Sequence, residues 1–179
     1  MSVSFNANSL DSVQYNGADL NFLKLNGTTI WERYPAGTVV FSFNIPGTYQ
    51  FVMPVAGYYR IQIVGGGSNG TSSANGRAGG YLSVTGRFYT YGRHTLTVGG
   101  CGDGTGGDTS FVNGLATADT IIAGGGGRGN TFRVLYTTEV NIPSGSGQVS
   151  NYDGSSTGPG AGGLINANGQ SGLAIITKI

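Results

Sequence analysis

The chain has 179 residues, and 35 glycines and 5 prolines together make up about a fifth of it. Charged residues are only 9% and the formal net charge is +1, so the chain lacks the basic stripe that tracks phosphates, which argues against nucleic-acid binding. Aromatic residues reach 11%, which argues against disorder and predicts one folded, loop-rich domain, or one domain with a small appendage.

The N-terminus lacks the charged-then-apolar pattern of a signal peptide, and no apolar run approaches the length of a membrane span. We therefore expect synthesis and assembly in a cytosol and no insertion into a membrane. The single cysteine, Cys101, cannot form an intramolecular disulfide.

Residues 1–34 contain a short repeat built around two Asn-Gly pairs. The segments Gln14–Leu20 and Lys24–Ile30 share the form x-apolar-Asn-Gly-x-x-apolar. Asn-Gly between strand-like flanks is the strongest short hairpin signal, because both residues tolerate a positive φ. The repeat predicts a small β-meander that is not stable alone and packs on the main body or on a partner. Its strands are expected at about 12–15, 18–25 and 28–33, with Phe22, Leu25, Ile30 and Trp31 on the buried face.

The expected boundary of this module is Pro35–Gly37, and the main domain spans residues 38–179. From Thr38 on, apolar residues alternate along short runs and no helical periodicity is present, which predicts an all-β domain. The natural architecture is an antiparallel sandwich or a jelly-roll-like body. Strands are expected at Val39–Phe43, Tyr49–Met53, Tyr59–Ile63, Tyr81–Thr85, Phe88–Tyr91, His94–Val98, Thr120–Ala123, Phe132–Thr138 and Leu173–Lys178.

Several of these strand-like runs pass directly into consecutive glycines. The clearest case is Thr120–Gly129, and the same transition occurs at Ile61–Gly67 and Leu96–Gly100, while Gly158–Gly163 repeats the glycines before the last strand. Because glycine lacks a Cβ, such segments can approach each other closely. We expect them to pack as extended, polyglycine-II-like threads that are hydrogen-bonded to each other and cap the body.

No motif in the chain supports catalysis or a cofactor. The two Gly-x-Gly-x-x-Gly matches, Gly65–Gly70 and Gly102–Gly107, open no helix, so phosphates would have no helix N-terminus to bind. His94 is the only histidine and lies on an expected strand, and no Gly-x-Ser-x-Gly elbow exists. Cys101 has no activating neighbour. We expect neither enzyme activity nor a cofactor.

Asp103 and Asp108 are the best candidates for a calcium site, because they bracket a glycine stretch. The segment Gly99–Gly102 begins like a nonapeptide calcium repeat, but Gly104 stands where the repeat requires an aspartate, and the repeat does not continue. Turns stabilised by the aspartate side chains are the better interpretation for both residues. No metal site is expected.

With catalysis, cofactors and metals set aside, the remaining candidate function is binding through the polar loops at 68–77, 102–107 and 144–157. A rigid glycine scaffold would hold such loops with little freedom, which lowers the ordering cost of binding. The alternative is that the loops are solvated connections without a partner. The residues predicted to contact a receptor are Asn69, Asn75, Arg77, Tyr152 and Asp153.

A series of motifs recurs along residues 38–179: Phe41–Phe43, Tyr49–Pro54, Gly57–Gly67, Gly79–Val84, Thr95–Gly100, Ile121–Gly127 and Gly172–Ile176. In this order they resemble the glycine-rich domain of tailed-bacteriophage virion proteins. They are also similar to the polyglycine-sandwich adhesins that cap long tail fibres, although the glycine runs here are shorter and more interrupted. The Asn-Gly repeat of residues 12–31 resembles short N-terminal modules of phage tail and fibre proteins, and it is far smaller than the attachment domain of an adhesin.

The resemblance implies a virion surface protein, most simply a tail-fibre or tail-tip component. Residues 1–34 would dock it to other virion proteins through Tyr15, Phe22 and Trp31, since aromatic residues dominate buried contacts. The polar loops would bind a host-surface glycan or an outer-membrane protein, with Tyr152 stacking on sugar rings. A homotrimer is the hypothesis that the symmetry of fibres suggests.

Two other functions stay open at this point. The chain could be a purely structural virion component, such as a capsid decoration, head fibre, baseplate or collar protein, with no receptor. An ice-binding protein made of polyglycine threads is the third class. The aromatic-rich strands and the irregular glycine spacing count against that class, because an ice-binding face is flat and repetitive.

Overall fold

The computed structural model describes residues 13–15, 18–20, 22–26, 28–114, 120–131, 136–145 and 148–179. The chain divides into two compact units, Met1–Pro35 and Ala36–Ile179. All regular elements of the described residues are strands, and these residues include no helix with the length and apolar character of a membrane span.

The N-terminal unit contains two antiparallel hairpins. Strand β1 (Val13–Tyr15) pairs with β2 (Ala18–Leu20), and β3 (Phe22–Leu25) pairs with β4 (Thr28–Glu32). Asn26, in the second turn, has a φ of 49°, as an Asn-Gly turn requires. The single middle strand expected for a meander is thus divided into β2 and β3, which belong to separate two-stranded sheets.

The three residues predicted to dock the protein on the virion lie on these strands. Tyr15 ends β1, Phe22 begins β3, and Trp31 lies in β4. Their side chains are outside the described part of the structure, so their docking role stays a prediction.

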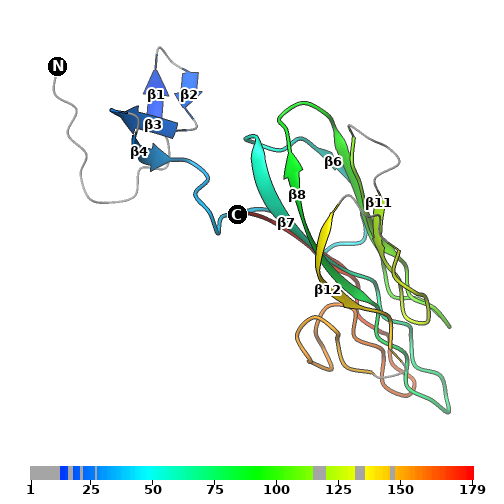
Figure 1. The fold of residues 1–179 in the computed structure, drawn as a ribbon. Coiled ribbons are helices and arrows are strands. Elements are labelled where there is room, and N and C mark those ends of the chain that lie inside the picture. The colour runs from blue at the N-terminus through cyan, green and yellow to red at the C-terminus, as the bar shows by residue number, and fades with distance from the viewer. Residues whose placement is uncertain are drawn as a thin grey trace. The chain divides into compact units, whose positions relative to one another are not determined.

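The main unit is an antiparallel β-sandwich (Figure 1). Its strands are β5 (Val39–Phe43), β6 (Gly47–Phe51), β7 (Gly57–Val64), β8 (Tyr81–Phe88), β9 (His94–Val98), β10 (Thr109–Val112), β11 (Thr120–Ala123), β12 (Thr137–Ile142) and β13 (Leu173–Lys178). One sheet has five strands in the order β12-β8-β7-β13-β5, and the other has four in the order β11-β10-β9-β6. The predicted all-β sandwich is therefore confirmed.

Several predicted strand boundaries are wrong. The strand predicted to end at Thr138 continues as β12 to Ile142, and residues 132–135 of that prediction lie outside the described residues. The strand predicted to stop at Thr85 continues as β8 to Phe88, so no separate strand begins there. Gly86 pairs with Tyr59 inside the ladder, and a side chain at this position would collide with the ring of Tyr136. Strand β10 (Thr109–Val112) was not predicted at all.

The core lies between the two sheets and is rich in aromatic rings. Tyr59, Ile61 and Ile63 of β7 point inward and are fully buried, as their alternation predicts. Phe88 of β8 meets Phe111 of β10 edge-on, with ring centroids 5.7 Å apart. Each fully buried large apolar side chain contributes about 1.5–3 kcal/mol, so this core accounts for most of the favourable free energy of folding.

A second, smaller apolar cluster consists of the buried residues Val64, Tyr81 and Leu173. Val64 and Leu173 face each other in the β7–β13 ladder, and Val64 also pairs with Tyr81 of β8. Tyr152, from the segment before β13, packs on this cluster. The segment that carries Tyr152 is thereby attached to the five-stranded sheet.

Candidate binding loops at the glycine-rich end

The run 65–70 directly follows β7 and forms the centre of the glycine-rich end. Its backbone N–H groups donate to three neighbouring segments in rotation: residues 65 and 68 to 77–80, residues 66 and 69 to 102–107, and residues 67 and 70 to 167–170, all at 2.8–2.9 Å. A repeat of three is what a thread with three residues per turn would give. The polyglycine-II form of the glycine-rich segments stays a prediction.

Close backbone approach at this run requires glycine. A Cβ on Gly65 would overlap the carbonyl oxygen of Gly124, and one on Gly66 would overlap that of Gly100. A Cβ on Gly67 would overlap the carbonyl oxygen of Ala161. Three chain segments therefore touch the central run where side chains are missing, and in Figure 1 these segments run side by side beyond the ends of the strands.

Asn69 joins two of the surrounding loops. Its Nδ2 donates to Oδ1 of Asp103 at 2.7 Å, and its Oδ1 accepts the N–H of Gly169 at 2.9 Å. Both ends of the amide are thus used inside the protein. Asn69 holds loops in place, and it is less available to a receptor than the sequence suggests.

Asn75 does the same on the other side of the 68–77 loop. Its Oδ1 accepts the N–H of Ile165 at 3.0 Å, and its Nδ2 donates to Oε1 of Gln148 at 3.3 Å. Although Asn75 is exposed, its amide links the 68–77 loop to the segments around 148 and 165. It is therefore a second loop-positioning residue.

Arg77 differs from the two asparagines. Its backbone is fixed by Ser68, whose N–H donates to the Arg77 carbonyl at 2.9 Å and whose Oγ accepts the Arg77 N–H at 2.7 Å. Its side chain is exposed and has no hydrogen bond or ion pair within the described residues. Arg77 therefore carries an exposed guanidinium group on a backbone that Ser68 holds in place.

Tyr152 and Asp153 lie on a different loop and have local roles. The ring of Tyr152 meets Tyr81 edge-on, with centroids 5.5 Å apart, and this packing uses part of the surface that was expected to stack on sugars. The Oδ1 of Asp153 accepts the N–H of Ser155 at 2.9 Å, which is a local turn contact. The structure groups Asn69, Asn75 and Arg77 in one loop, and it keeps these two residues apart from them in sequence and in contacts.

Two exposed apolar residues beside these loops are not among those predicted from the sequence. Leu164 and Ile165 are 57% and 50% exposed, in a turn closed by the hydrogen bond from the Ala167 N–H to the Leu164 carbonyl. The N–H of Asn166 in this turn donates to Thr71, which places the turn against the 68–77 loop. The sequence signal for this exposed turn was the apolar pair Leu164–Ile165 between Gly163 and Asn166, and the pair is too short to indicate a strand.

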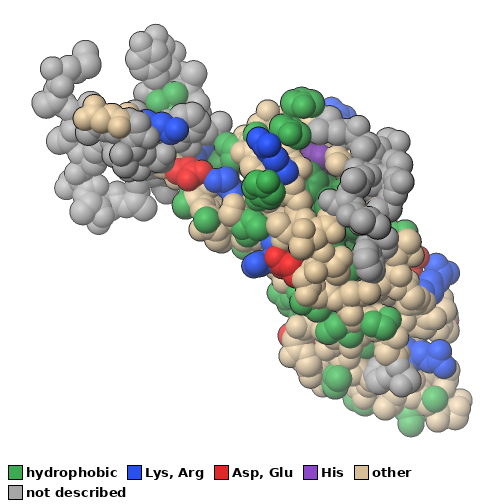
Figure 2. All heavy atoms as spheres, viewed as in Figure 1, with side chains coloured by type: hydrophobic (Ala, Val, Ile, Leu, Met, Phe, Trp, Pro, Cys, Tyr) green, Lys and Arg blue, Asp and Glu red, His purple; other side chains and the backbone are tan. Residues whose placement is uncertain are grey.

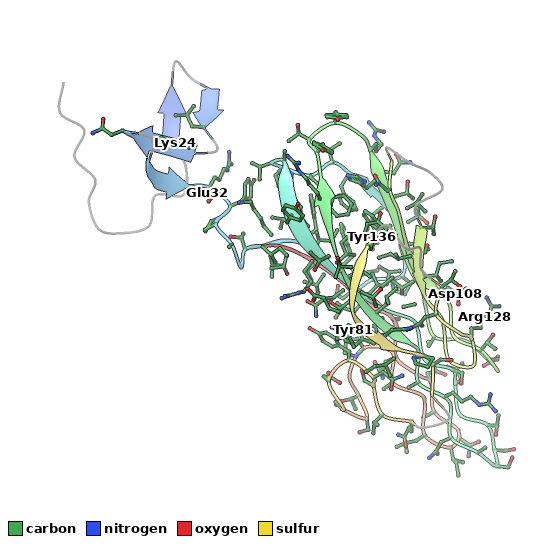
Figure 3. All side chains as sticks on the ribbon, in the orientation of Figure 1. Lys24, Glu32, Tyr81, Asp108, Arg128 and Tyr136 are labelled. Carbon is green, nitrogen blue, oxygen red and sulfur yellow. The ribbon has the colours of Figure 1, made fainter. Side chains whose placement is uncertain are left out.

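The aspartates have roles other than the side-chain-stabilised turns predicted for them. Asp103 accepts from Asn69, while Asp108 accepts the N–H of Gly125 at 2.9 Å and pairs with Arg128 at 3.2 Å. Figure 3 shows the Asp108 and Arg128 side chains on neighbouring segments of this end. Both carboxylates thus hold separate segments together. The described residues include no group of three or more His, Cys, Asp or Glu that could hold a metal ion.

The surface of this end is mostly uncharged. Figure 2 shows a few isolated or paired charged side chains among polar side chains and backbone on the visible face of the main unit. Such a surface adapts to partners through hydrogen bonds and apolar contacts more than through long-range charge.

Comparison with known proteins gave no match to a family model and no significant similarity to a curated protein.

Proposed function

We propose that the protein is a bacteriophage virion surface protein, a tail-fibre or tail-tip component that attaches to the host cell through the loops at its glycine-rich end. The observation that supports this proposal is that Asn69 and Asn75 join the 68–77 loop to three other segments, around residues 103, 148 and 165–169. Loops that are already ordered lose little entropy when they bind, so a small contact area suffices.

The chemistry left for a partner comes from side chains that the protein does not use internally. Arg77 offers a cation, and Leu164 and Ile165 offer exposed apolar surface. Aliphatic side chains pack well on a protein and poorly on a sugar ring, so an outer-membrane protein suits this set better than a glycan. The packing of Tyr152 on Tyr81 removes part of the reason to expect sugar stacking.

A competition experiment tests the proposal. Purified protein, added in excess, should block adsorption of the parent phage to host cells in a dose-dependent way. The double variant Arg77→Ala with Ile165→Ser should lose this blocking and keep its melting temperature, because both side chains are exposed. The matched control is Arg93→Ala, since Arg93 precedes β9 at the end of that strand opposite to its glycines.

A structural role without a receptor is the second candidate. It is favoured by the internal contacts of Asn69, Asn75, Tyr152 and Asp153, four of the five predicted receptor residues. If folded protein fails to block adsorption even when displayed in many copies, which removes weak single-site affinity as a cause, the attachment role is excluded. The structural role then predicts that Trp31→Ala prevents incorporation into the particle.

A further inference from the structure

A group of tyrosine and arginine side chains lies at the end of the five-stranded sheet that is opposite to the glycine-rich end. Tyr58 and Arg60 lie near the start of β7, and Arg87 lies near the end of β8. Tyr58 and Arg87 face each other in the ladder between these strands, so their side chains leave the same face of the sheet. This is the outer face, because the next residues along the two strands, Tyr59 and Phe88, are buried in the core.

Two further tyrosines extend this group beyond β8. The guanidinium of Arg87 lies over the ring of Tyr89, 5.3 Å from its centroid, and the rings of Tyr89 and Tyr91 stack with their centroids 5.4 Å apart. Tyr58 is 56% exposed and Tyr91 is 63% exposed. Tyr58, Arg60, Arg87, Tyr89 and Tyr91 thus form one solvent-accessible area, which we call the tyrosine–arginine surface.

The charge of this surface is positive. Arg60 is neutralised by Glu139, whose carboxylate accepts the Arg60 Nε–H at 2.6 Å. Arg87 is exposed, and within the described part of the chain it makes no hydrogen bond or ion pair. The sequence has no acidic residue between Glu32 and Asp103, so neither β7 nor β8 carries a carboxylate. The surface therefore offers an unpaired cation beside three phenol groups.

Tyrosine and arginine together are typical of the energetically important residues in protein–protein contacts. A tyrosine ring gives a large contact area with few rotatable bonds, and a guanidinium pairs with a carboxylate through two parallel hydrogen bonds. A sugar fits less well, because stacking needs a free ring face and the Tyr89 ring already contacts Arg87 and Tyr91. The surface therefore suits a protein that presents carboxylates.

The chain enters the main unit beside this surface. Gly37 donates its N–H to the Lys178 carbonyl at 2.8 Å, and Lys178 pairs with Tyr59, the neighbour of Tyr58. A protein bound by residues 1–34 is therefore tethered by the chain itself to this end of the main unit, which begins at Ala36. Tethering raises the effective concentration of that protein at the tyrosine–arginine surface.

We propose that the tyrosine–arginine surface binds an acidic patch on the virion protein to which residues 1–34 dock. Arg87 pairs with a carboxylate of this patch, and Tyr58 and Tyr91 pack around the pair. This inference rests on the proposed function, because the partner is a component of the particle. Two points of attachment fix the direction of the main unit, and β7 runs from this surface to the glycine-rich run at its other end. The receptor-binding loops then face away from the particle.

The test measures two properties of the full-length protein. These are its copy number per particle, counted by quantitative mass spectrometry of purified phage, and its ability to block adsorption when it is added in excess. The variant Arg87→Glu with Tyr91→Ala should lower the copy number about tenfold or more, because a like charge then faces the acidic patch and an aromatic contact is lost. Both side chains are exposed, so the purified variant should keep its melting temperature and its blocking activity.

Arg93→Glu is the matched control and should leave the copy number unchanged. Arg93 is also exposed, but its guanidinium donates to Gln50 of β6, in the four-stranded sheet. If the double variant has a lower melting temperature, Arg87→Gln alone gives the same test.

The outcomes separate this inference from the proposed function. A normal copy number for the double variant overturns the inference alone, and if that variant also no longer blocks adsorption, the surface binds a host glycan instead. A wild-type protein that is missing from the particle overturns the proposed function, and the inference with it. A wild-type protein that is present in the particle but does not block adsorption overturns only the attachment role, and the copy numbers still decide the inference.

Discussion

The buried ring of His94 accepts a hydrogen bond from the backbone N–H of Gly114 through Nδ1, at 3.2 Å. The ring stacks on Phe111 and meets Phe88 edge-on, and its Nε2 has no hydrogen-bond partner in the described part of the chain. Only the neutral ring can accept at Nδ1, because both nitrogens of the imidazolium are donors. His94 is therefore held neutral, and burial lowers its pKa from the ordinary 6.5.

This environment predicts that mild acid destabilises the protein. Because the folded-state pKa of His94 is lowered, the unfolded chain takes up the proton first. The free energy of unfolding is therefore highest above about pH 6.5. It declines as the pH falls below that value, with a slope of up to about 1.4 kcal/mol per pH unit. Urea unfolding between pH 8 and pH 5 would measure this decline in the free energy of unfolding.

His94 is the only histidine, so the effect can be assigned to it by one substitution. His94→Phe keeps an aromatic ring in the core and removes the titration. The variant should be less stable than the wild type at pH 8, because the Gly114 N–H loses its acceptor, yet nearly independent of pH down to pH 5. A wild-type stability that is flat over this range would contradict the neutral, buried histidine.

A second prediction concerns the loop contacts of Asn69. In Asn69→Ala the buried N–H of Gly169 loses its acceptor and Asp103 loses a donor, which should cost about 1–3 kcal/mol. The melting temperature should fall by roughly 2–4 °C per kcal/mol for a chain of this size. Asn168→Ala, an exposed neighbour, is the matched control and should change little. Equal melting temperatures for the two variants would show that Asn69 does not hold the loops.

The fold can be predicted from the sequence where buried and exposed side chains alternate along a strand. The contacts within the candidate site cannot be predicted in this way. The alternation of Tyr59, Ile61 and Ile63 identified both the strand and its inward face. Strand β10 escaped prediction because four residues beside Asp108 carry almost no local pattern. They form a strand because β9 and β11 lie on either side. Pairing of this kind is tertiary information, and local propensity does not contain it.

The roles of the site residues could not be predicted for the same physical reason. Asn69 and Asn75 look like free loop residues because glycine and small polar residues surround them. Their partners, Gly169 and Ile165, stand 100 and 90 residues further along the chain. A sequence can indicate that a loop is polar, but whether a polar group is already satisfied depends on segments that only the fold brings together.

A third prediction tests the close approach of backbones in the glycine-rich end. In Gly66→Ala the new Cβ would overlap the carbonyl of Gly100, so the central run must move away from its neighbour. The expected result is a loss of about 1–3 kcal/mol or more and a lower yield of folded protein. Gly129→Ala is the control, because a Cβ there meets no atom within 4 Å. Thermal unfolding of the two variants checks this, and equal stability would contradict the tight contact.

The last prediction concerns Glu139, the charged residue of edge strand β12. Its carboxylate accepts hydrogen bonds from Arg60 and Thr85, each at 2.6 Å, and from Ser83 at 3.0 Å. Burial by itself would raise the pKa of Glu139, but these bonds outweigh burial and hold the pKa below the ordinary 4.5. The contribution of Glu139 to the free energy of unfolding is therefore present above about pH 4.5. It is lost as the pH falls through the lower pKa that Glu139 has in the folded state.

Glu139→Gln should accordingly lower the free energy of unfolding by about 0.5–1 kcal/mol at pH 7, a modest value because the ion pair is partly exposed. A double-mutant cycle with Arg60→Gln separates the ion pair from the two hydroxyl contacts, since Thr85 and Ser83 are present in all four proteins. The coupling energy between positions 60 and 139 should be favourable at pH 7 and should vanish at a pH low enough to protonate the carboxylate. A coupling that does not change with pH would mean that packing, and not charge, joins β12 to β7.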